Sequence, residues 1–516
     1  MTSQRRPLRY QMRHALPLAL AAIALVAGAV AWLVHFQSGL VLSHYDAKAH
    51  LVVARRVFDN LTPGWQQIGA VWLPLPHLLN MLPAQIDAFY RTGIAASALS
   101  IASFAVCAWA SARLVLAVTA SAAGAVVAVA ALALNPNLLY LQATPMTEPL
   151  LVALSSLVVL FLFEWLDADG DPVPTRLGLA LAALAWTRYE GWAVTGASIG
   201  AAALAMWLRG TPVPVVVRRA VRLAVWPAAA VALFLINSRI TVGAWFVSGG
   251  FYVPDPTYQD ELGRTLVSVW WGTHELSGYV LEVTALVAAA ALVVRAIVRR
   301  DQAHAIVPVA LLAAAALPLY AFFQGHPYRI RYMIPLVAAC ATLAGIGVGL
   351  VGSRLAAPVR WALALALTAS VIVESPPWSR QAPLLLEAQW DRPNSAARRA
   401  VSACLAREYH GDKILASMGS LAHYMQELSH EGFDIADFVN EGNGVIWQLA
   451  METGPAPHAG WMLVEEQAEG GDVLAQRLRE APAFAKGMER ICEGGGVALY
   501  RRSAVGHPSS AVGRRP

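Results

Sequence analysis

The sequence predicts an all-α polytopic membrane protein followed by a small α/β domain. Of its 516 residues, 57% are hydrophobic and 14% are charged, whereas about a quarter of the residues of a soluble domain are charged. Apolar windows near the ~20 residues needed to cross a bilayer recur along most of the chain. After Pro376-Pro377 the composition becomes mixed. We therefore expect a transmembrane domain over 1–378, a soluble domain over 379–505 and a disordered tail over 506–516.

About eleven apolar windows are expected to be transmembrane helices. They are 15–36, 93–112, 116–134, 148–166, 177–189, 192–208, 221–239, 278–297, 304–323, 333–352 and 360–375. The first window follows several arginines as a signal peptide would, but it has the length of a membrane span. Two of the windows are short and meet at Arg188 and Glu190, where charge is costly if it lies inside the bilayer.

The distribution of arginine predicts the orientation. Arg5, Arg6, Arg9 and Arg13 precede the first window, and further arginines lie in the short connections that share its side of the membrane. Such loops are cytoplasmic by the positive-inside rule. The prediction is a multi-pass inner (plasma) membrane protein with a cytoplasmic N-terminus and an extracytoplasmic C-terminal domain. The segments expected outside are a long first loop, 37–92, and the loops 135–147, 240–277 and 324–332.

The C-terminal domain is expected to be a small α/β fold. Its expected strands are 413–416, 461–464 and about 497–500, with helices over 421–430 and 472–480. Cys404 and Cys492 lie in this region, and the sequence leaves open whether they pair. Cys107 and Cys340 lie in apolar windows and are interpreted as packing residues.

An acid follows the first expected helix in the stretch Tyr45-Asp-Ala-Lys-Ala-His50. Asp46 and His50 are four residues apart, so a helix would place both on one face. At a membrane exit, Asp46 is suited to accept a proton from an attacking hydroxyl. The alternative is an ordinary helix cap or interfacial charge. His50 is considered as a metal ligand, but no second ligand lies at a suitable spacing.

Two further acids lie on the side expected to be outside. Glu148 follows Thr147 at the start of a window, where the helix dipole favours an acid and threonine is a common cap. Glu190 lies two residues after Arg188. If the pair has a purely structural role, the two charges neutralise each other. Either acid is alternatively a ligand for substrate.

The stretch from His326 to Tyr332, HPYRIRY, carries Arg329 and Arg331 on the side where the positive-inside rule disfavours arginine. Guanidinium groups bind phosphate through paired hydrogen bonds. Contact with lipid head groups is the alternative. With the acids above, this stretch predicts an outward-facing polar cavity that holds a phosphate.

On these motifs, YDAKAH, TPMTEPL, TRYEGW and HPYRIRYMIP, the chain resembles the C superfamily of glycosyltransferases (GT-C). These are integral membrane enzymes that use lipid-phosphate sugar donors. The resemblance covers about residues 15–375 and is nearest to the branch of protein O-mannosyltransferases and aminoarabinose transferases. Many members carry two adjacent acids in the first loop. Here Asp46 is followed by Ala47. The single acid weakens the case for a metal-dependent reaction, because paired carboxylates suit a divalent cation.

The resemblance implies an inverting transfer of a sugar to an acceptor hydroxyl, with Asp46 as the general base. The leaving polyprenyl phosphate would be held by Arg329 and Arg331, with Arg188 as a further ligand. Substrate-binding roles are implied for other polar residues of the same motifs, namely Lys48, His50, Glu148, Glu190, His326, Tyr328 and Tyr332.

The implied partners are a polyprenyl-phosphate sugar, a lipid, glycan or protein acceptor, and membrane lipids. No polybasic run indicates nucleic acid. No cofactor is assigned, and a divalent metal stays an open alternative that the motifs do not support. Trp270 and Trp271 would stack on sugar rings or anchor their loop at the interface. The alternative function is a transporter or flippase of a lipid-linked or polar solute, in which Arg188 and Glu190 line the pathway. A non-catalytic assembly protein is a third hypothesis.

Overall fold

The computed structural model describes residues 5–169, 171–247, 252–468 and 471–503. The chain divides into two compact units. Unit 1 comprises Met1–Ala54, Gly69–Ser248 and Pro254–Trp390, and unit 2 comprises Arg55–Ile68, Gly249–Val253 and Asp391–Pro516. The sequence-based boundary at 378/379 stays a prediction. The expected tail, 506–516, lies outside the described residues.

Unit 1 is helical, as predicted. Within the described ranges, nine helices are long and apolar enough to cross a membrane, and two further apolar helices are shorter. They are α1 (Arg5–Gln37), α5 (Ile94–Thr119), α6 (Ala122–Ala133), α8 (Glu148–Asp167), α9 (Thr175–Ala185), α10 (Glu190–Leu208), α11 (Val213–Val242), α13 (Tyr279–Val298), η3 with α14 (Arg300–Ala315, Ala316–Phe323), α15 (Ile334–Gly352) and α16 (Ala357–Glu374). Each predicted window is one of these helices, so the multi-pass membrane fold class is confirmed.

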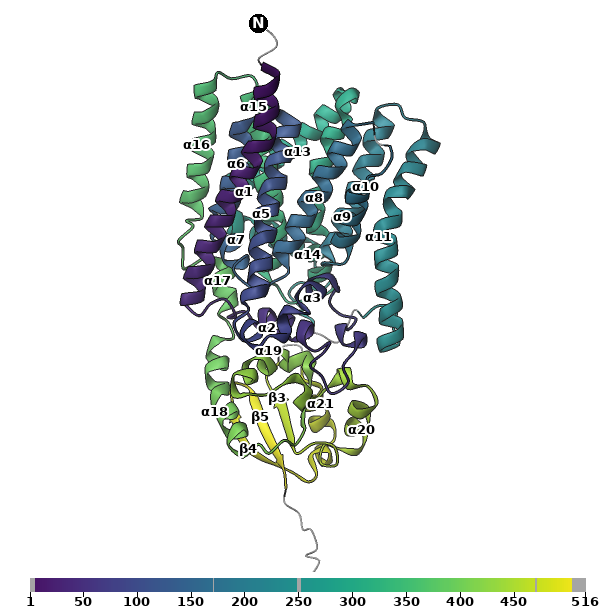
Figure 1. Cartoon of the computed structure of the whole chain (residues 1–516), viewed down its shortest axis with the longest axis vertical. Coiled ribbons are helices and arrows are strands. Elements are labelled where there is room, and N and C mark those ends of the chain that lie inside the picture. The colour runs from purple at the N-terminus through teal and green to yellow at the C-terminus, as the bar shows by residue number, and fades with distance from the viewer. Residues whose placement is uncertain (1–4, 170, 248–251, 469–470, 504–516) are drawn as a thin grey trace, which may run out of the picture. The chain divides into compact units, whose positions relative to one another are not determined.

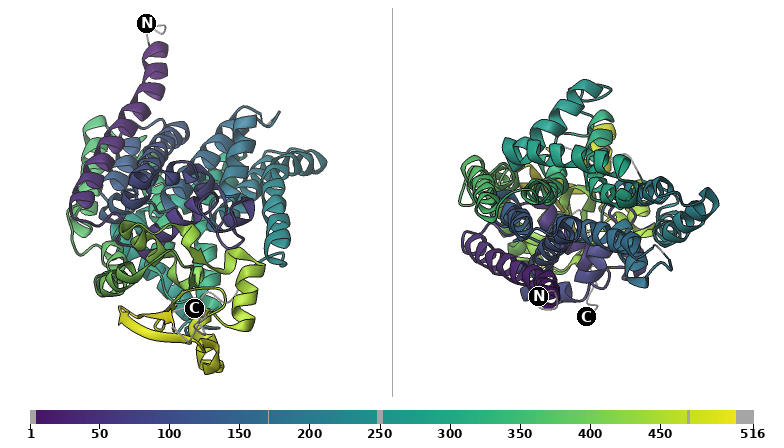
Figure 2. Two further views of the ribbon diagram at one scale, coloured as in Figure 1. Left: turned by 60° about the horizontal axis from the view of Figure 1, so that its bottom comes forward. Right: turned by 90° about the horizontal axis from the view of Figure 1, so that it is seen from above.

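Shorter helices occupy the connections of unit 1. They are α2 (Tyr45–Arg55), α3 (Leu75–Asn80), η2 (Pro83–Gln85), α4 (Asp87–Thr92), α7 (Pro136–Leu141), α12 (Leu262–Ser277), η4 (Ile330–Met333) and α17 (Pro383–Ala388). Figure 1 shows α2, α3 and α17 at one end of the helices of unit 1, whereas α1 begins at the opposite end. The view along the helices in Figure 2 shows α1 and α11 on opposite sides of the unit. The short helices α2, α3 and α17 therefore gather at one end of the helices of unit 1.

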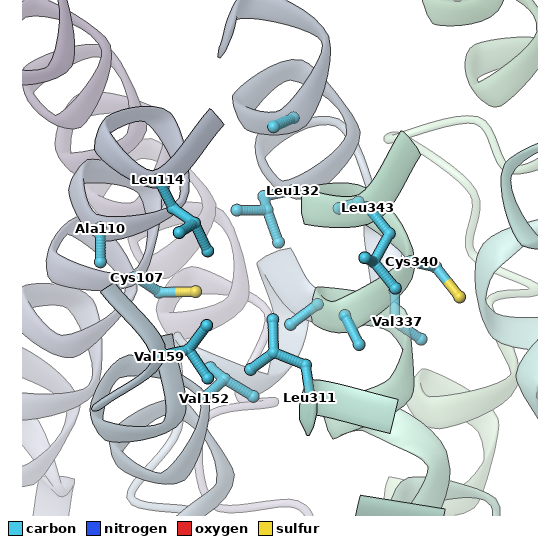
Figure 3. Close-up of a cluster of buried hydrophobic side chains, with 14 of the residues drawn as sticks. Cys107, Ala110, Leu114, Leu132, Val152, Val159, Leu311, Val337, Cys340 and Leu343 are labelled. Atoms are coloured by element: carbon cyan, nitrogen blue, oxygen red, sulfur yellow. The ribbon is translucent and has the colours of Figure 1, made fainter. Parts of the chain in front are cut away.

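The core of unit 1 is a tightly packed apolar cluster. Figure 3 shows Val152 and Leu311 side by side within it, together with Cys107 and Cys340. Both cysteines are free and buried, which agrees with their interpretation as packing residues. Without a hydrophobic driving force between helices in lipid, such close packing supplies much of the association energy.

Small residues bring α6 and α15 into close contact. A Cβ added at Gly345 would lie 2.7 Å from the Cβ of Ala128 and 2.6 Å from the carbonyl oxygen of Gly124. Nearby, the hydroxyls of Ser111 and Thr342 are 2.9 Å apart and join α5 to α15. Glycine at position 345 is therefore required by the separation of two helices.

Replacing Gly345 with leucine is expected to destabilise unit 1 by about 1–3 kcal/mol, because the added atoms overpack a rigid interface. The measurement is thermal unfolding of the purified protein in detergent. Gly200→Leu on α10 is the matched control, since that glycine is exposed and a Cβ there meets no atom within 4 Å. Equal melting temperatures for the two variants would contradict this account of the interface.

Unit 2 is built on a five-stranded sheet with strand order β2-β1-β3-β5-β4. The strands are β1 (Ile414–Ala416), β2 (Phe438–Val439), β3 (Trp461–Glu465), β4 (Met488–Gly494) and β5 (Val497–Arg502). β1 pairs in parallel with β2 and β3, and β5 is antiparallel to β3 and β4. The predicted small α/β domain is confirmed. β2 and β4 were not predicted, because β2 has two residues and β4 carries several charges.

Four helices accompany the sheet: α18 (Arg392–Glu408), α19 (Met418–Leu428), α20 (Val445–Thr453) and α21 (Val473–Glu480). The predicted helices over 421–430 and 472–480 correspond to α19 and α21. Cys404 of α18 and Cys492 of β4 form a disulfide, which resolves the pairing that the sequence left open.

Part of the predicted first outside loop, Arg55–Ile68, belongs to unit 2. The Gln67 amide donates to the carbonyl oxygen of Gly442 at 2.8 Å, and the Asn443 amide donates to the Asn60 side chain at 2.7 Å. Gly442 and Asn443 follow β2 and lie at the carboxyl end of the parallel strands. Hydrogen bonds, rather than apolar burial alone, therefore hold this segment in unit 2.

Candidate active site

The site begins at the amino-terminal end of α2. The helix contains good helix formers such as alanine and leucine, and Asp46 lies in its first turn, where the helix dipole favours a negative charge. Helical geometry places His50 one turn further on the same face, as predicted. Asp46, Lys48 and His50 are all buried. Lys48 is two residues from Asp46, so it leaves the helix in a different direction.

An ion pair joins Asp46 to Arg331 of η4. The Arg331 Nη2 group contacts Asp46 Oδ2, and both side chains are buried. The Nη1 group of the same guanidinium lies 3.1 Å from Nε2 of His44. On the other side of the imidazole, Nδ1 of His44 accepts a hydrogen bond from the backbone N–H of Asp46 at 3.1 Å. The predicted acid and one predicted phosphate ligand are thus in direct contact.

The charge state of Asp46 follows from this environment. Burial alone raises the pKa of its carboxyl group, but the charge and hydrogen bond of Arg331, together with the neighbouring His44 and His50 side chains, lower it by more. The resulting pKa lies well below the ordinary value for aspartate. Asp46 is therefore ionised at neutral pH, although its negative charge is shared with Arg331.

A second cluster surrounds Arg188, which lies between α9 and α10. Its guanidinium lies 3.1 Å from Glu148 and 2.9 Å from Glu190, the first residues of α8 and α10. It also donates to the hydroxyl of Thr147 at 2.9 Å, so Thr147 binds Arg188 and its side chain does not cap α8. The predicted ion pair of Arg188 with Glu190 is present, and Glu148 is a second acidic partner of Arg188.

The two clusters lie close enough to influence each other. Burial lowers the pKa of Arg188, but the carboxylates of Glu148 and Glu190 raise it by more, and the charge of Arg331 opposes them. The net result is an Arg188 pKa well above its ordinary value. Three acids on three helices and two arginines therefore form one polar region.

His50 packs into this region as a neutral imidazole. Its Nδ1 atom lies 3.0 Å from Nε2 of His77 in α3, and its ring lies 4.1 Å from that of Trp72. Burial lowers the pKa of His50 first, and His77, Arg188 and Arg331 lower it further against the charge of Asp46. Among the described residues, no group of three or more His, Cys, Asp and Glu side chains could hold a metal ion.

The HPYRIRY stretch is divided between two environments. Nε2 of His326 lies 3.2 Å from the Tyr332 hydroxyl, and the Arg331 guanidinium lies 5.7 Å from the centre of the Tyr332 ring. Tyr328 and Arg329 instead line a cavity of about 360 Å³.

Sequence reasoning missed Glu387 of α17. Its Oε2 atom accepts a hydrogen bond from the backbone N–H of Ile330 at 2.9 Å, and its Oε1 atom lies 3.7 Å from Nε2 of His44. Burial raises the Glu387 pKa, but His44 and Arg331 lower it by more. Glu387 lies in the mixed composition after Pro377, where the sequence shows no motif. The sequence offered one signal for this cluster, because His44 lies two residues before Asp46.

No protein-family model matches this chain, and no curated protein matches it. Among solved structures, the chain is similar to the crystal structure of ArnT from Cupriavidus metallidurans bound to undecaprenyl phosphate. The superposition has a TM-score of 0.56 and covers 94% of this chain and 98% of that chain, at 13% sequence identity. The chain has the fold of ArnT. The predicted resemblance to the aminoarabinose transferase branch is confirmed at the level of the fold, over both units.

Removing Arg331 tests the buried ion pair. Arg331→Gln leaves Asp46 as an unpaired buried charge, which is expected to cost about 3–5 kcal/mol of stability at neutral pH. Arg490→Gln is the control, because its carboxylate partner Glu466 is exposed and such pairs contribute under about 1 kcal/mol.

The loss in Arg331→Gln should depend on pH. In the native protein, the pKa of Asp46 is lower than in the unfolded chain. The ion pair therefore contributes its full stability above the unfolded pKa of Asp46, and this stability is lost only in strong acid. Without Arg331, burial raises that pKa, so Asp46 protonates in mild acid and the destabilisation shrinks. The melting temperatures of the native protein and of Arg331→Gln, measured from about pH 5 to 8, should therefore move further apart as the pH rises. A constant or narrowing gap would contradict the ion pair.

Proposed function

We propose that this protein is an integral membrane glycosyltransferase that moves a sugar from a polyprenyl-phosphate donor to an acceptor hydroxyl. The observation that carries the proposal is the buried Asp46–Arg331 pair within a fold shared with ArnT. The pair supplies a carboxylate to accept a proton and a guanidinium to bind a phosphate. ArnT is bound to undecaprenyl phosphate in its crystal structure, which supports a lipid-phosphate donor here.

Arg331 is the better of the two buried arginines for holding the donor phosphate. Arg188 is already neutralised by Glu148 and Glu190, whereas Arg331 has Asp46 as its close acidic partner. A guanidinium has five N–H donors in a planar fork, so Arg331 can bind a phosphate while keeping part of its contact with Asp46. Arg329 supplies a second positive charge two residues earlier in the chain.

The proposed reaction is a single displacement. The acceptor oxygen attacks the anomeric carbon as the bond from that carbon to the phosphate oxygen breaks, and the bonding electrons leave with the polyprenyl phosphate. The acceptor proton passes to Asp46 and the configuration inverts. Arg331 stabilises the negative charge that develops on the leaving phosphate. As the phosphate draws Arg331 toward itself, the carboxylate of Asp46 becomes a stronger base.

The other polar residues of the region would orient the sugar and the acceptor. Glu148 and Glu190 would accept hydrogen bonds from sugar hydroxyls, while His50 would bind substrate from the face of α2 that carries Asp46 and Lys48 from another face. The arginine distribution of the sequence supports an extracytoplasmic active site in the inner membrane, with the N-terminus in the cytoplasm. The described residues contain no ligand cluster for a metal, and the proposed displacement uses none.

Replacing Asp46 with asparagine is expected to lower kcat by about 10²- to 10⁴-fold, the usual contribution of a general base. The measurement is release of lipid phosphate from a panel of polyprenyl-phosphate sugars by the purified protein. Asp87→Asn in α4 is the matched control, because Asp87 is half exposed and pairs with Arg91 on the surface.

Near-normal turnover by the Asp46→Asn variant would remove Asp46 from the role of base. No release from any donor by the native protein would favour the transporter hypothesis instead.

A further inference from the structure

Two asparagines lie at the start of α7, and both side chains are fully buried. Asn135 precedes the helix, and its Oδ1 atom accepts the backbone N–H groups of Asn137 and Leu138, both at 3.0 Å. Asn135 therefore caps α7 in the usual way. Asn137 lies in the first turn of the same helix, and its amide group is not needed for this cap.

The Asn137 amide instead binds the ends of two other helices. Its Nδ2 group donates to the carbonyl oxygen of Leu276 at 3.1 Å, near the carboxyl end of α12. Its Oδ1 atom accepts the backbone N–H of Leu384 at 3.1 Å, in the first turn of α17. The last carbonyls and the first N–H groups of a helix have no partner within that helix. Asparagine has both a donor and an acceptor, so one side chain satisfies a group of each kind.

The anchored helix α17 carries Glu387, which contacts the candidate active site. Glu387 lies one turn beyond the N–H that is held, and its carboxylate accepts the backbone N–H of Ile330 at the start of η4. The same carboxylate lies against His44. His44 in turn contacts Arg331 and the backbone of Asp46. The position of α17 therefore determines where this carboxylate meets η4 and His44.

α17 is too short to hold its own position. It has six residues, and isolated helices of this length are not stable in water. α7 and α12 pack against it, and Figure 1 shows α7 beside α17. Leu384 and Leu385 are buried, but apolar burial has no preferred direction. A hydrogen bond restrains both distance and angle, so the bond from α17 to Asn137 restrains the helix more closely than its apolar contacts do.

We propose that Asn137 is a positioning residue of the candidate active site. Its hydrogen bond to α17 sets the place of the Glu387 carboxylate, and that carboxylate in turn fixes η4 and His44. Asp46 and Arg331 are thereby kept in contact. The inference deepens the proposed sugar transfer, and its consequence for catalysis rests on that function. The mechanical link from α7 to η4 does not depend on the reaction.

Hydrogen–deuterium exchange of the purified full-length protein tests this link without a substrate. Asn137→Leu removes both hydrogen bonds while keeping a side chain of similar shape. The backbone amides of α17 and of η4 are expected to exchange about fivefold faster or more, because a buried hydrogen bond contributes about that factor to a local opening equilibrium.

Asn135→Ser is the matched control. Serine keeps a good cap on α7, but the variant loses the hydrogen bond from Asn135 Nδ2 to the same Leu276 carbonyl, which is 2.6 Å long in the native protein. The hydrogen bond to α17 is left in place, so exchange in α17 and η4 should be native. Native exchange of η4 in Asn137→Leu, or an equal increase in Asn135→Ser, would overturn the proposal.

Asn137→Ser is the second variant if Asn137→Leu does not fold. Its single hydroxyl is shorter than the amide and does not reach both helices, so faster exchange of η4 is expected here as well. Native exchange of η4 in this variant would equally contradict the link.

A double-mutant cycle tests the consequence for catalysis. In a sugar-transfer assay, Asn137→Leu is expected to lower kcat by about tenfold or more, because small displacements of reacting groups are costly, whereas Asn135→Ser should keep the native kcat. Because Asn137 acts through Glu387, adding Asn137→Leu to Glu387→Ala should lower kcat little further. A purely structural role would multiply the two losses, and that result would overturn the proposal.

The two measurements distinguish this inference from the proposed function. If the native protein transfers sugar from no donor, the proposed function fails. The exchange of η4 then still decides whether Asn137 positions this part of the site.

Discussion

The buried ion pair between Asp46 and Arg331 is the interaction on which the candidate site depends. Removing two charges from water is expensive, and the cost is recovered only when each charge finds a close partner and further hydrogen bonds. Arg331 contacts Asp46 and His44, and His44 in turn accepts the backbone N–H of Asp46. The start of α2 and η4 are thereby fixed against each other, and the walls of the neighbouring cavity with them.

The two arginine clusters of unit 1 have different balances of charge. Arg188 is held by two carboxylates, Glu148 and Glu190, so an incoming anion would have to displace a full set of partners. Arg331 has one such partner, and that partner is the proposed base. A phosphate that competes with Asp46 for Arg331 would couple donor binding to the basicity of Asp46. Under the proposed mechanism, this coupling would prevent proton abstraction from being favoured before the donor is present.

The sequence predicts most of the helical fold because bilayer thickness imposes a length and composition on every span, and each of the eleven windows shows both. It also predicts the Arg188–Glu190 contact, since the two residues are neighbours in the chain. The contact of Asp46 with Arg331, and the role of Glu387, depend on tertiary packing that no local pattern records. For the same reason, the place of Arg55–Ile68 in unit 2 follows from hydrogen bonds to residues after β2 that lie far away in the sequence.

Binding of undecaprenyl phosphate in the absence of turnover tests the central claim most directly. If Asp46 and the donor phosphate compete for Arg331, Asp46→Asn should bind the lipid phosphate several-fold more tightly than the native protein. Arg331→Gln should bind it about tenfold or more weakly, a loss of ~1.4 kcal/mol or more. Weaker binding by Asp46→Asn, or native affinity in Arg331→Gln, would contradict the shared guanidinium and the mechanism built on it.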